Sequence, residues 1–270
     1  MTVTLDDIRA AARRIAGAGH VVETPLVEDT ALSARLGQPI WLKCEYRQTT
    51  GAFKLRGATN AILSLQGKVR GVVTASTGNH GRAVAHAAKT LGVPATICLS
   101  RLVPANKVQA IRDLGATVRI VGNSQDEAMV EVARALSEEG LTEIPPFDHP
   151  DVVAGQGTIG LEIGAPEAVL VPLSGGGLAA GIAVAIKALS PGTRVIGLTM
   201  ENGAAMAASI RAGRSVEVTE TASLADSLGG GIGLGNRVTF PLCRDLLDDV
   251  ILLTEAEIAQ GIRHLGRAGH

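Results

Sequence analysis

The groups in this sequence most able to do chemistry are a lysine and two turns rich in glycine. Lys54 lies in the first turn of an expected helix, within residues 49–58, after a strand that ends near Glu45. A helix N-terminus carries a partial positive charge, so a free ammonium is unfavourable there and the lysine would be more natural as a neutral imine. The segment fits a solvated structural lysine equally well, so it does not decide between these interpretations by itself.

One glycine turn, residues 76–81, reads Ser-Thr-Gly-Asn-His-Gly and is expected to end a strand and begin a helix. Its glycines let a ligand approach the backbone closely, and Ser76, Thr77 and Asn79 place hydroxyl and amide groups beside free helix N–H donors. This arrangement suits a carboxylate. The alternative is that the polar side chains only cap the helix and that His80 is a structural histidine.

The other glycine turn, residues 174–178, reads Ser-Gly-Gly-Gly-Leu and lies between the apolar run 169–173 and a further helix. Three consecutive glycines weaken both helices and strands, so they indicate close approach by a ligand. Unhindered N–H groups at a helix start form a phosphate cradle, to which Ser174 can add a hydroxyl donor. The spacing matches neither a dinucleotide fingerprint nor a Walker loop, so a single phosphate is favoured.

Alternating strands and helices must position these turns. From Pro39 onward, short apolar runs rich in β-branched residues alternate with segments of helical periodicity. The expected strands are residues 40–45, 71–76, 95–100, 117–121, 143–147, 168–173, 195–199 and 250–253, and the expected helices are residues 52–65, 79–91, 104–114, 125–139, 156–163, 178–189, 204–212 and 255–265. Gly92, Gly115 and Gly140 each follow an expected helix, where a left-handed cap favours glycine. The alternation predicts an α/β fold of open parallel sheets with helices on both faces, and ligands at the carboxyl ends of strands.

The amino-acid composition favours a globular α/β protein and argues against some classes of partner. Hydrophobic residues form 46% of the chain, enough for a large core, while aromatic residues form only 2% beside 33 glycines, which suits closely packed helices on a parallel sheet. The formal charge of -1 argues against nucleic acid and anionic membranes as partners. Three scattered cysteines and an N-terminus without a signal-peptide pattern indicate the cytoplasm.

Taken in this order, the three turns resemble those of fold type II pyridoxal-phosphate (PLP) enzymes, the tryptophan synthase β-like family, and within it the threonine/serine dehydratase branch. Members of that branch carry a Ser/Ala-Phe-Lys-x-Arg-Gly-Ala segment with the cofactor lysine, a Ser-x-Gly-Asn-His-Gly loop for the substrate carboxylate and a glycine-rich phosphate loop. The matching residues here are 52–58, 76–81 and 174–178, and the resemblance extends to residues 104–107 and 154–158.

The resemblance implies roles for individual residues. Lys54 would remove the α-proton of the substrate, and Thr77 could act on the opposite face. The implied cofactor contacts are Phe53, Lys54, Asn79, Ser174, Gly175, Gly176, Gly177 and Leu178. The implied substrate contacts are Ser76, Thr77, Gly78, Asn79 and His80. No metal is expected, because small residues follow Glu201 where some relatives place an acidic group.

The resemblance also implies an organisation and a reaction. A large PLP-binding domain would comprise residues 1–70 and 148–270, and a small domain, residues 71–147, would carry the asparagine loop. The implied reaction is PLP-dependent β-elimination from a small amino-acid substrate with a β-hydroxyl group, such as threonine or serine, which yields a 2-oxo acid and ammonia. A homodimer is a further implication.

Two departures from the family pattern leave alternatives open. Residues 224–234, together with Ser174, resemble the dehydratases of hydroxyectoine and ectoine degradation. The sequence ends at His270, before the late Ser, Thr or Cys that binds the pyridine nitrogen in relatives, so one alternative is a non-catalytic relative that binds PLP or an amino acid. Another is a nucleotide-binding α/β protein in which Lys54 is structural.

Overall fold

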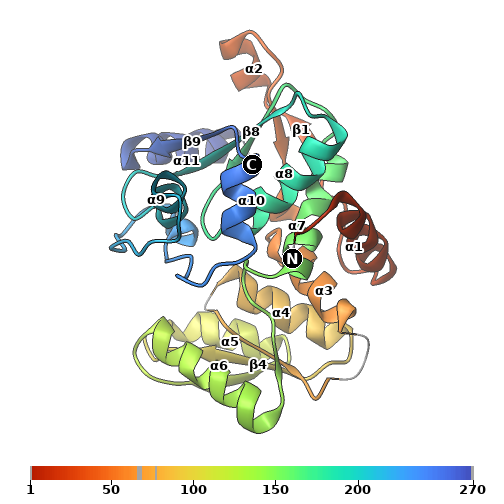
Figure 1. The fold of residues 1–270 in the computed structure, drawn as a ribbon, viewed down its shortest axis with the longest axis vertical. Coiled ribbons are helices and arrows are strands. Elements are labelled where there is room, and N and C mark those ends of the chain that lie inside the picture. Colours follow the sequence, from red (N-terminus) through yellow and green to blue (C-terminus); the bar gives the residue numbers. More distant parts are fainter. Residues whose placement is uncertain (1, 66–68, 77, 269–270) are drawn as a thin grey trace.

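The computed structural model describes residues 2–65, 69–76 and 78–268, and the strands within these residues form two parallel sheets and a hairpin (Figure 1). One parallel sheet has the strand order β5-β4-β3-β6 and the other β7-β8-β9, while β1 and β2 pair antiparallel. The strands are β1 (Leu26–Glu28), β2 (Trp41–Lys43), β3 (Val72–Ala75), β4 (Ala95–Leu99), β5 (Thr117–Ile120), β6 (Thr142–Glu143), β7 (Ala168–Pro172), β8 (Arg194–Met200) and β9 (Asp249–Leu253). The helices are α1 (Leu5–Gly17), α2 (Thr30–Leu36), η1 (Glu45–Arg47), α3 (Lys54–Ser64), α4 (Asn79–Thr90), α5 (Ala105–Asp113), α6 (Gln125–Glu139), α7 (Pro150–Glu162), α8 (Gly177–Leu189), α9 (Ala205–Ala212), η2 (Asp226–Leu228), α10 (Thr239–Leu246) and α11 (Glu255–Ala268).

Helices cover both faces of the four-stranded sheet because its side chains alternate between two clusters. Val73 and Cys98 pack with buried residues of α6, whereas Val72 and Ile97 pack with α4 and α5. Successive residues of a strand point to opposite faces, so a strand buried on both sides must be apolar throughout. This requirement explains the continuous apolar runs in the sequence.

The three-stranded sheet packs against α8, the helix that the triple-glycine turn begins. Val171 and Val195 of the sheet share one core cluster with α8, Ile8 of α1 and Phe240 of α10. The residues of α8 from Ala179 to Ile186 are all buried. The start of α8 is therefore fixed in the middle of the larger part of the molecule.

Helix α7 crosses α3 and α8 at glycine contacts that leave no room for a side chain. A Cβ on Gly155 would lie 2.6 Å from the Cα of Gly57 and 2.7 Å from the carbonyl oxygen of Arg56. On the other side of α7, a Cβ on Gly181 would lie 2.4 Å from the carbonyl oxygen of Val153. These close crossings account for a core built with glycine and alanine in place of aromatic residues.

Gly155→Ala is expected to destabilise the fold by about 1–3 kcal/mol, because the added methyl group must push α3 away from α7. The midpoint of urea unfolding measures this loss. Gly261→Ala in the exposed helix α11 is the matched control, since no described atom lies within 4 Å of a Cβ added there. Alanine at that position should raise the free energy of unfolding by up to about 1 kcal/mol. Equal midpoints for the two variants would contradict the close crossing.

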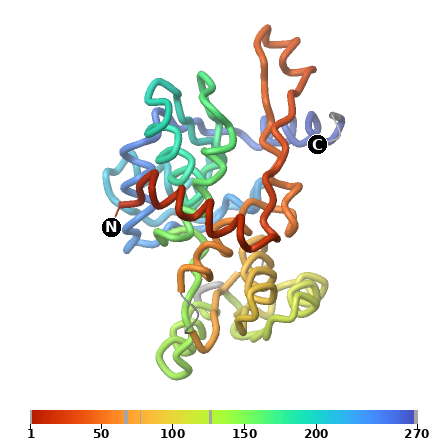
Figure 2. The backbone as a smooth tube through the Cα atoms, turned by 90° about the vertical axis from the view of Figure 1, so that its right-hand side faces the viewer, coloured from red at the N-terminus to blue at the C-terminus, as the bar shows by residue number. Residues whose placement is uncertain are grey.

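The β1–β2 hairpin and α2 extend from the body beside the C-terminal helix (Figure 2). Asp29 caps α2 by accepting a hydrogen bond from the backbone N–H of Leu32 at 2.9 Å. Its other carboxylate oxygen lies 2.6 Å from Nε2 of His264 on α11. The first and last parts of the described chain are thus joined by a side-chain contact.

The predicted fold class is confirmed: the chain has an α/β architecture with parallel sheets and helices on both faces. The glycines expected after helices are left-handed, with φ values of 67°, 85° and 66° at Gly92, Gly115 and Gly140. None of the described helices is long and apolar enough to cross a membrane.

Three local expectations were wrong. The strand at residues 40–45 does not join a parallel sheet, because its observed part, β2, pairs with β1 in the hairpin. The strand expected at 143–147 stops at Glu143, because Pro145 and Pro146 lack the N–H groups that a strand ladder needs. The helix expected from residue 156 begins earlier, at Pro150, since proline is well suited to the first helical position.

Candidate active site

Lys54 begins α3, and its amine points to the backbone of a segment distant in sequence. Nζ donates a hydrogen bond to the carbonyl oxygen of Pro146 at 2.6 Å and lies 5.4 Å from the ring centre of Phe53. Burial lowers the pKa of this amine to about 8, from an ordinary value of 10.5. A larger share of the amine is therefore neutral near physiological pH than in a solvated lysine, which suits a nucleophile.

His80 lies in the first turn of α4 and bonds to the same distant segment. Its Nε2 donates to the carbonyl oxygen of Ile144 at 2.8 Å, because a carbonyl group can only accept. Burial, and then the nearby charge of Lys54, lower the pKa of His80 to about 3. The ring is therefore neutral, and its Nδ1 is a bare acceptor without a partner among the described residues.

The turn before α4 presents backbone N–H groups. Gly78 is the N-cap of α4, and no described side chain caps that helix. Ser76 accepts a long hydrogen bond from the N–H of Gly78 at 3.5 Å, and Oδ1 of Asn79 accepts from Arg82 at 2.6 Å. Capping by Ser76 or Asn79, the simpler expectation for this turn, is thus not found, while Thr77 lies outside the described residues.

The triple-glycine turn begins α8 and requires glycine. Gly176, the N-cap of α8, has a left-handed φ of 87°, and the described residues provide no side-chain cap for this helix. A Cβ on Gly175 would lie 2.3 Å from the ring of Phe147. Ser174 and Leu178 flank the turn and are half-buried. The first N–H groups of α8 thus remain at the positive end of its dipole, where an anion is favoured.

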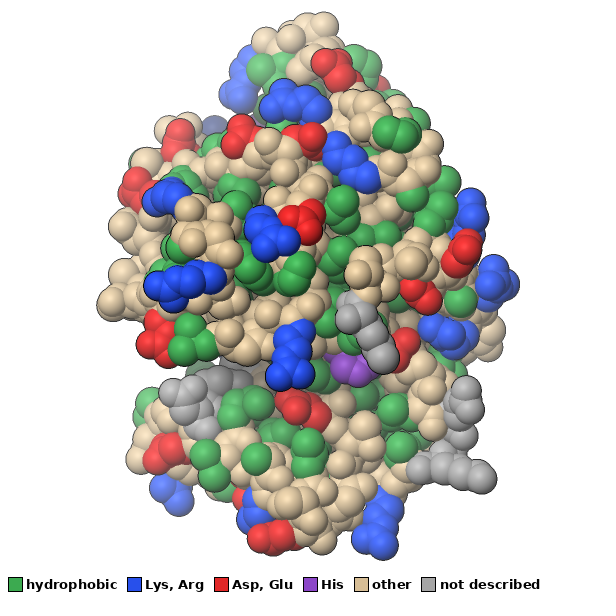
Figure 3. Space-filling model, viewed as in Figure 1, with side chains coloured by type: hydrophobic (Ala, Val, Ile, Leu, Met, Phe, Trp, Pro, Cys, Tyr) green, Lys and Arg blue, Asp and Glu red, His purple; other side chains and the backbone are tan. Residues whose placement is uncertain are grey.

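A single stretch, residues 144–149, brings these groups together, and we call it the crossing segment. The lysine amine and the imidazole both bond to its carbonyl oxygens, and Phe147 packs on the triple-glycine turn. Asp148 accepts hydrogen bonds of 2.8–2.9 Å from three backbone N–H groups, those of residues 237–239 at the start of α10. The molecular surface in Figure 3 is hollowed between the smaller lower part and the larger upper part, which this segment links.

Sequence reasoning missed the crossing segment and the partners of Arg56. The signal for the segment was the run Pro-Pro-Phe-Asp at residues 145–148, because consecutive prolines end a strand and leave its carbonyl oxygens without a ladder partner. The partners of Arg56 come from residues far apart in sequence, including Glu45 and Glu162. No local spacing could have identified them.

Comparison with known proteins decides the family. The family model described as "Pyridoxal-phosphate dependent enzyme" matches residues 17–270. The chain belongs to this family. It is 60% identical over 268 residues to a protein of Sinorhizobium fredii whose provisional name is threonine dehydratase, covering 97% of this chain and 80% of that relative. It is 42% identical over 269 residues to the L-threonine ammonia-lyase of Thermotoga maritima, covering 97% of this chain and 66% of that protein.

Solved structures of two enzymes share the fold. Maize serine racemase superposes with a TM-score of 0.92 at 36% identity, covering 98% of this chain and 81% of that protein. The processed form of threonine deaminase isoform 2 from Solanum lycopersicum gives a TM-score of 0.89 at 34% identity, covering 98% of this chain and 79% of that one. The predicted fold type and the predicted cofactor, PLP, are therefore confirmed.

The residues present fit PLP. An aldehyde needs a neutral amine, and the buried environment of Lys54 favours the neutral form. A phosphate needs unhindered N–H donors, and the uncapped start of α8 provides them at Gly176 and Gly177. Both groups lie against the crossing segment, the amine at Pro146 and the glycine turn at Phe147.

Proposed function

We propose that the chain removes the β-hydroxyl group of a small hydroxy amino acid, threonine or serine, and releases a 2-oxo acid and ammonia. One observation carries this proposal. The amine of Lys54 bonds to Pro146, and the triple-glycine turn packs against Phe147, the next residue of the crossing segment. A covalent attachment point for an aldehyde and a cradle for a phosphate are thereby held close together.

Lys54 serves as both the attachment point and the base. PLP, when bound, delocalises the negative charge that develops as the α-proton leaves. A pKa near 8 matches the freed amine to proton transfer near neutral pH, and the carbonyl oxygen of Pro146 stabilises the ammonium that results. The N–H groups of Gly175, Gly176 and Gly177 would hold the phosphate, with Ser174 and Leu178 beside them.

The turn at the start of α4 binds the substrate in this proposal. Ser76, Thr77, Gly78 and the adjoining N–H groups hold the carboxylate and so orient the Cα–H bond for removal. Neutral His80 fastens this turn to the crossing segment without placing a second positive charge beside Lys54. The remaining predicted contacts to the cofactor ring are Phe53 and Asn79.

Two domains on either side of the site complete the proposal. Strands β3 to β6, which form the four-stranded sheet, all lie within residues 71–147, the proposed small domain. Residues 1–70 and 148–270 form the proposed large domain. Approach of the small domain would exclude water during proton transfer.

A finer proposal concerns the substrate, which we place among the hydroxy amino acids of hydroxyectoine and ectoine degradation. Its support is the glycine-rich stretch within residues 224–234. No described atom lies within 4 Å of a Cβ added to Gly230 or Gly231, so the space beside these two glycines is open. This stretch leads directly to residues 237–239, which bond to Asp148 of the crossing segment.

A substrate panel on PLP-loaded protein tests these proposals. Release of a 2-oxo acid and ammonia is measured with threonine, serine and the hydroxy amino acids formed from hydroxyectoine. Turnover of any of these substrates supports elimination. The preferred substrate decides between threonine or serine and the hydroxy amino acids of hydroxyectoine degradation. A yellow protein that turns over none would be a non-catalytic relative, and a colourless one that binds nucleotide would refute the role of Lys54.

We also propose a homodimer in a reducing cytoplasm. Cys44, Cys98 and Cys243 are all buried free thiols, as is usual in a reducing compartment. Light scattering of the purified protein measures its mass in solution, and a mass of one chain would refute the dimer.

Attachment of PLP to the cofactor-free protein is expected to become faster as pH rises, to reach half of its limiting rate near pH 8 and to level off by about pH 9. Only a neutral amine attacks the aldehyde, and the neutral fraction of Lys54 grows as pH rises through its lowered pKa of about 8. The growth of visible absorbance at each pH measures the rate. A rate that keeps rising to about pH 10 would mean an unperturbed lysine and would contradict the buried amine.

A further inference from the structure

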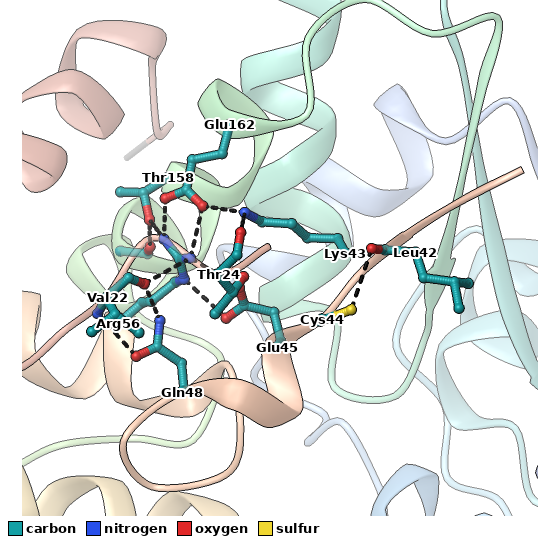
Figure 4. Close-up of polar contacts among 11 residues, drawn as sticks. Val22, Thr24, Leu42, Lys43, Cys44, Glu45, Gln48, Arg56, Thr158 and Glu162 are labelled. Carbon is teal, nitrogen blue, oxygen red and sulfur yellow. Dashed lines mark hydrogen bonds and ion pairs between the residues drawn. The ribbon is translucent and has the colours of Figure 1, made fainter. Parts of the chain in front are cut away.

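A buried arginine two residues after Lys54 joins the start of α3 to distant segments (Figure 4). Arg56 has 0% exposure, and a buried guanidinium is costly unless its donors are paired. Nε and Nη2 each donate to Glu45 at 2.9 Å, and Nη1 and Nη2 donate to Glu162 at 2.5 and 2.8 Å. Paired bonds with fixed directions therefore hold the guanidinium between two carboxylates.

A second cation balances this cluster. Nζ of Lys43 lies 2.5 Å from Glu162 and donates to the carbonyl oxygen of Thr24 at 2.6 Å. Burial alone would lower the pKa of Arg56, but hydrogen bonds to Glu162 and Glu45 outweigh it and raise that pKa. Two cations and two anions thus form a neutral cluster, and loss of one member would leave a buried charge without its partner.

The cluster fixes the first turn of α3 from several directions. Glu45 lies in η1, directly after the hairpin, whereas Glu162 lies in the last turn of α7. Arg56 also donates to Thr158 of α7 at 3.1 Å and to the carbonyl oxygen of Val22 at 3.3 Å. Because no described side chain caps α3, these bonds are well placed to set where its first turn lies and how the helix is rotated.

The close crossing of α3 and α7 needs such directional bonds. At Gly57 and Gly155 the two helices touch through their backbones. Two packed helices resist rotation when the side-chain ridges of one helix fill the grooves of the other. Where the two backbones touch at glycines, no side chain forms such a ridge. Arg56, the neighbour of Gly57, adds directional bonds to Thr158 and Glu162 on α7, beside the hydrogen bonds that Gln156 and Asp151 of α7 make with α3.

Lys54 and Arg56 point to different sides of α3, since two residues correspond to a rotation of about 200°. Turning the helix by about 10° would move a side-chain atom about 6 Å from its axis by about 1 Å. A displacement of this size can cost about 100-fold in rate. We propose that Arg56 is a positioning residue that holds the amine of Lys54 at Pro146, an inference that rests on the proposed role of Lys54.

Arg56→Lys tests the proposal, because lysine keeps the charge and loses the planar fork. We expect the variant to fold and to bind PLP, with kcat at least about tenfold lower and KM little changed, because the base is displaced while the substrate turn is intact. The pH midpoint of PLP attachment should also move, because the amine leaves its buried position. Unchanged kcat together with an unchanged midpoint would overturn the proposal.

Arg14→Lys is the matched control. Nε of Arg14 on α1 donates to Asn60 of α3 at 2.8 Å, and its Nη2 lies 3.8 Å from Asp151 of α7, so this arginine joins the same two helices away from Lys54. Its replacement should lower the thermal midpoint and leave kcat and the attachment midpoint at their wild-type values. If the loss of kcat in both variants is proportional to the decrease in their thermal midpoints, Arg56 acts only on stability and the proposal is wrong.

Thr158→Val provides a milder test should Arg56→Lys fail to fold. It removes one neutral partner of the guanidinium and leaves both carboxylates in place. A smaller shift of the attachment midpoint is expected, and a wild-type midpoint would overturn the proposal. Failure of the proposed function would look different: the wild-type protein would then turn over none of the hydroxy amino acids, while the attachment midpoint would still report the effect of position 56.

Discussion

Lys54→Ala is expected to abolish the visible absorbance of attached PLP and to lower kcat by at least about 1000-fold. Alanine has no amine to bond to the aldehyde, and the same change removes the base that takes the α-proton, a role that alone contributes about 10²–10⁴-fold. Absorbance spectra of the PLP-saturated variant and the release of 2-oxo acid measure the two losses.

Lys89→Ala is the control for this prediction. Lys89 is an exposed residue of α4, and among the described residues its amine donates a long hydrogen bond of 3.5 Å to the carbonyl oxygen of Asp113. Its removal should leave both absorbance and turnover unchanged. Wild-type absorbance in Lys54→Ala would show that PLP is attached elsewhere and would refute the proposed site.

Ser174→Asp is expected to weaken PLP binding by at least about 100-fold. The carboxylate would stand at the start of the triple-glycine turn, where the proposed phosphate lies, and two like charges about 4 Å apart near a protein surface repel by about 4 kcal/mol. Titration of cofactor-free protein with PLP, followed by absorbance, measures the dissociation constant.

Ser174→Asn separates charge from size in that experiment. Asparagine has nearly the shape of aspartate and no charge, so it should weaken PLP binding far less. Raising the salt concentration should recover part of the affinity of the aspartate variant, because salt screens the repulsion. Equal dissociation constants for the two variants would place the phosphate away from this turn.

Much of the fold follows from local patterns in the sequence. Helix α6 spans Gln125–Glu139 as expected because both ends carry local signals: Ser124 caps its start and left-handed Gly140 ends it. Helix α10 had no such signal and was not expected. Its first N–H groups are satisfied by Asp148, about 90 residues earlier, so only the folded structure reveals what starts it.

Some parts of the candidate site could likewise be predicted from the sequence, and others could not. The lysine and both glycine turns could be recognised because the chemistry of each depends on residues adjacent in sequence, and the family they indicated is confirmed. Their relation to one another depends on the crossing segment, whose backbone oxygens bind Lys54 and His80. Its prolines indicate where the strand ends, but they do not indicate which distant side chains these oxygens meet. The roles assigned to individual residues stay predictions, including that of Thr77, which lies outside the described residues.

The acceptor for Lys54 is a main-chain oxygen, and every amino acid carries one. Substitutions at position 146 therefore cannot delete the acceptor during evolution, although they can change how firmly it is held. Proline restricts the backbone of the free chain more than other residues do, so Pro145 and Pro146 reduce the entropy lost when this oxygen is set in place. The contact to Lys54 thus depends on a backbone atom that no substitution removes. The side chains at these positions affect only how rigidly that atom is held.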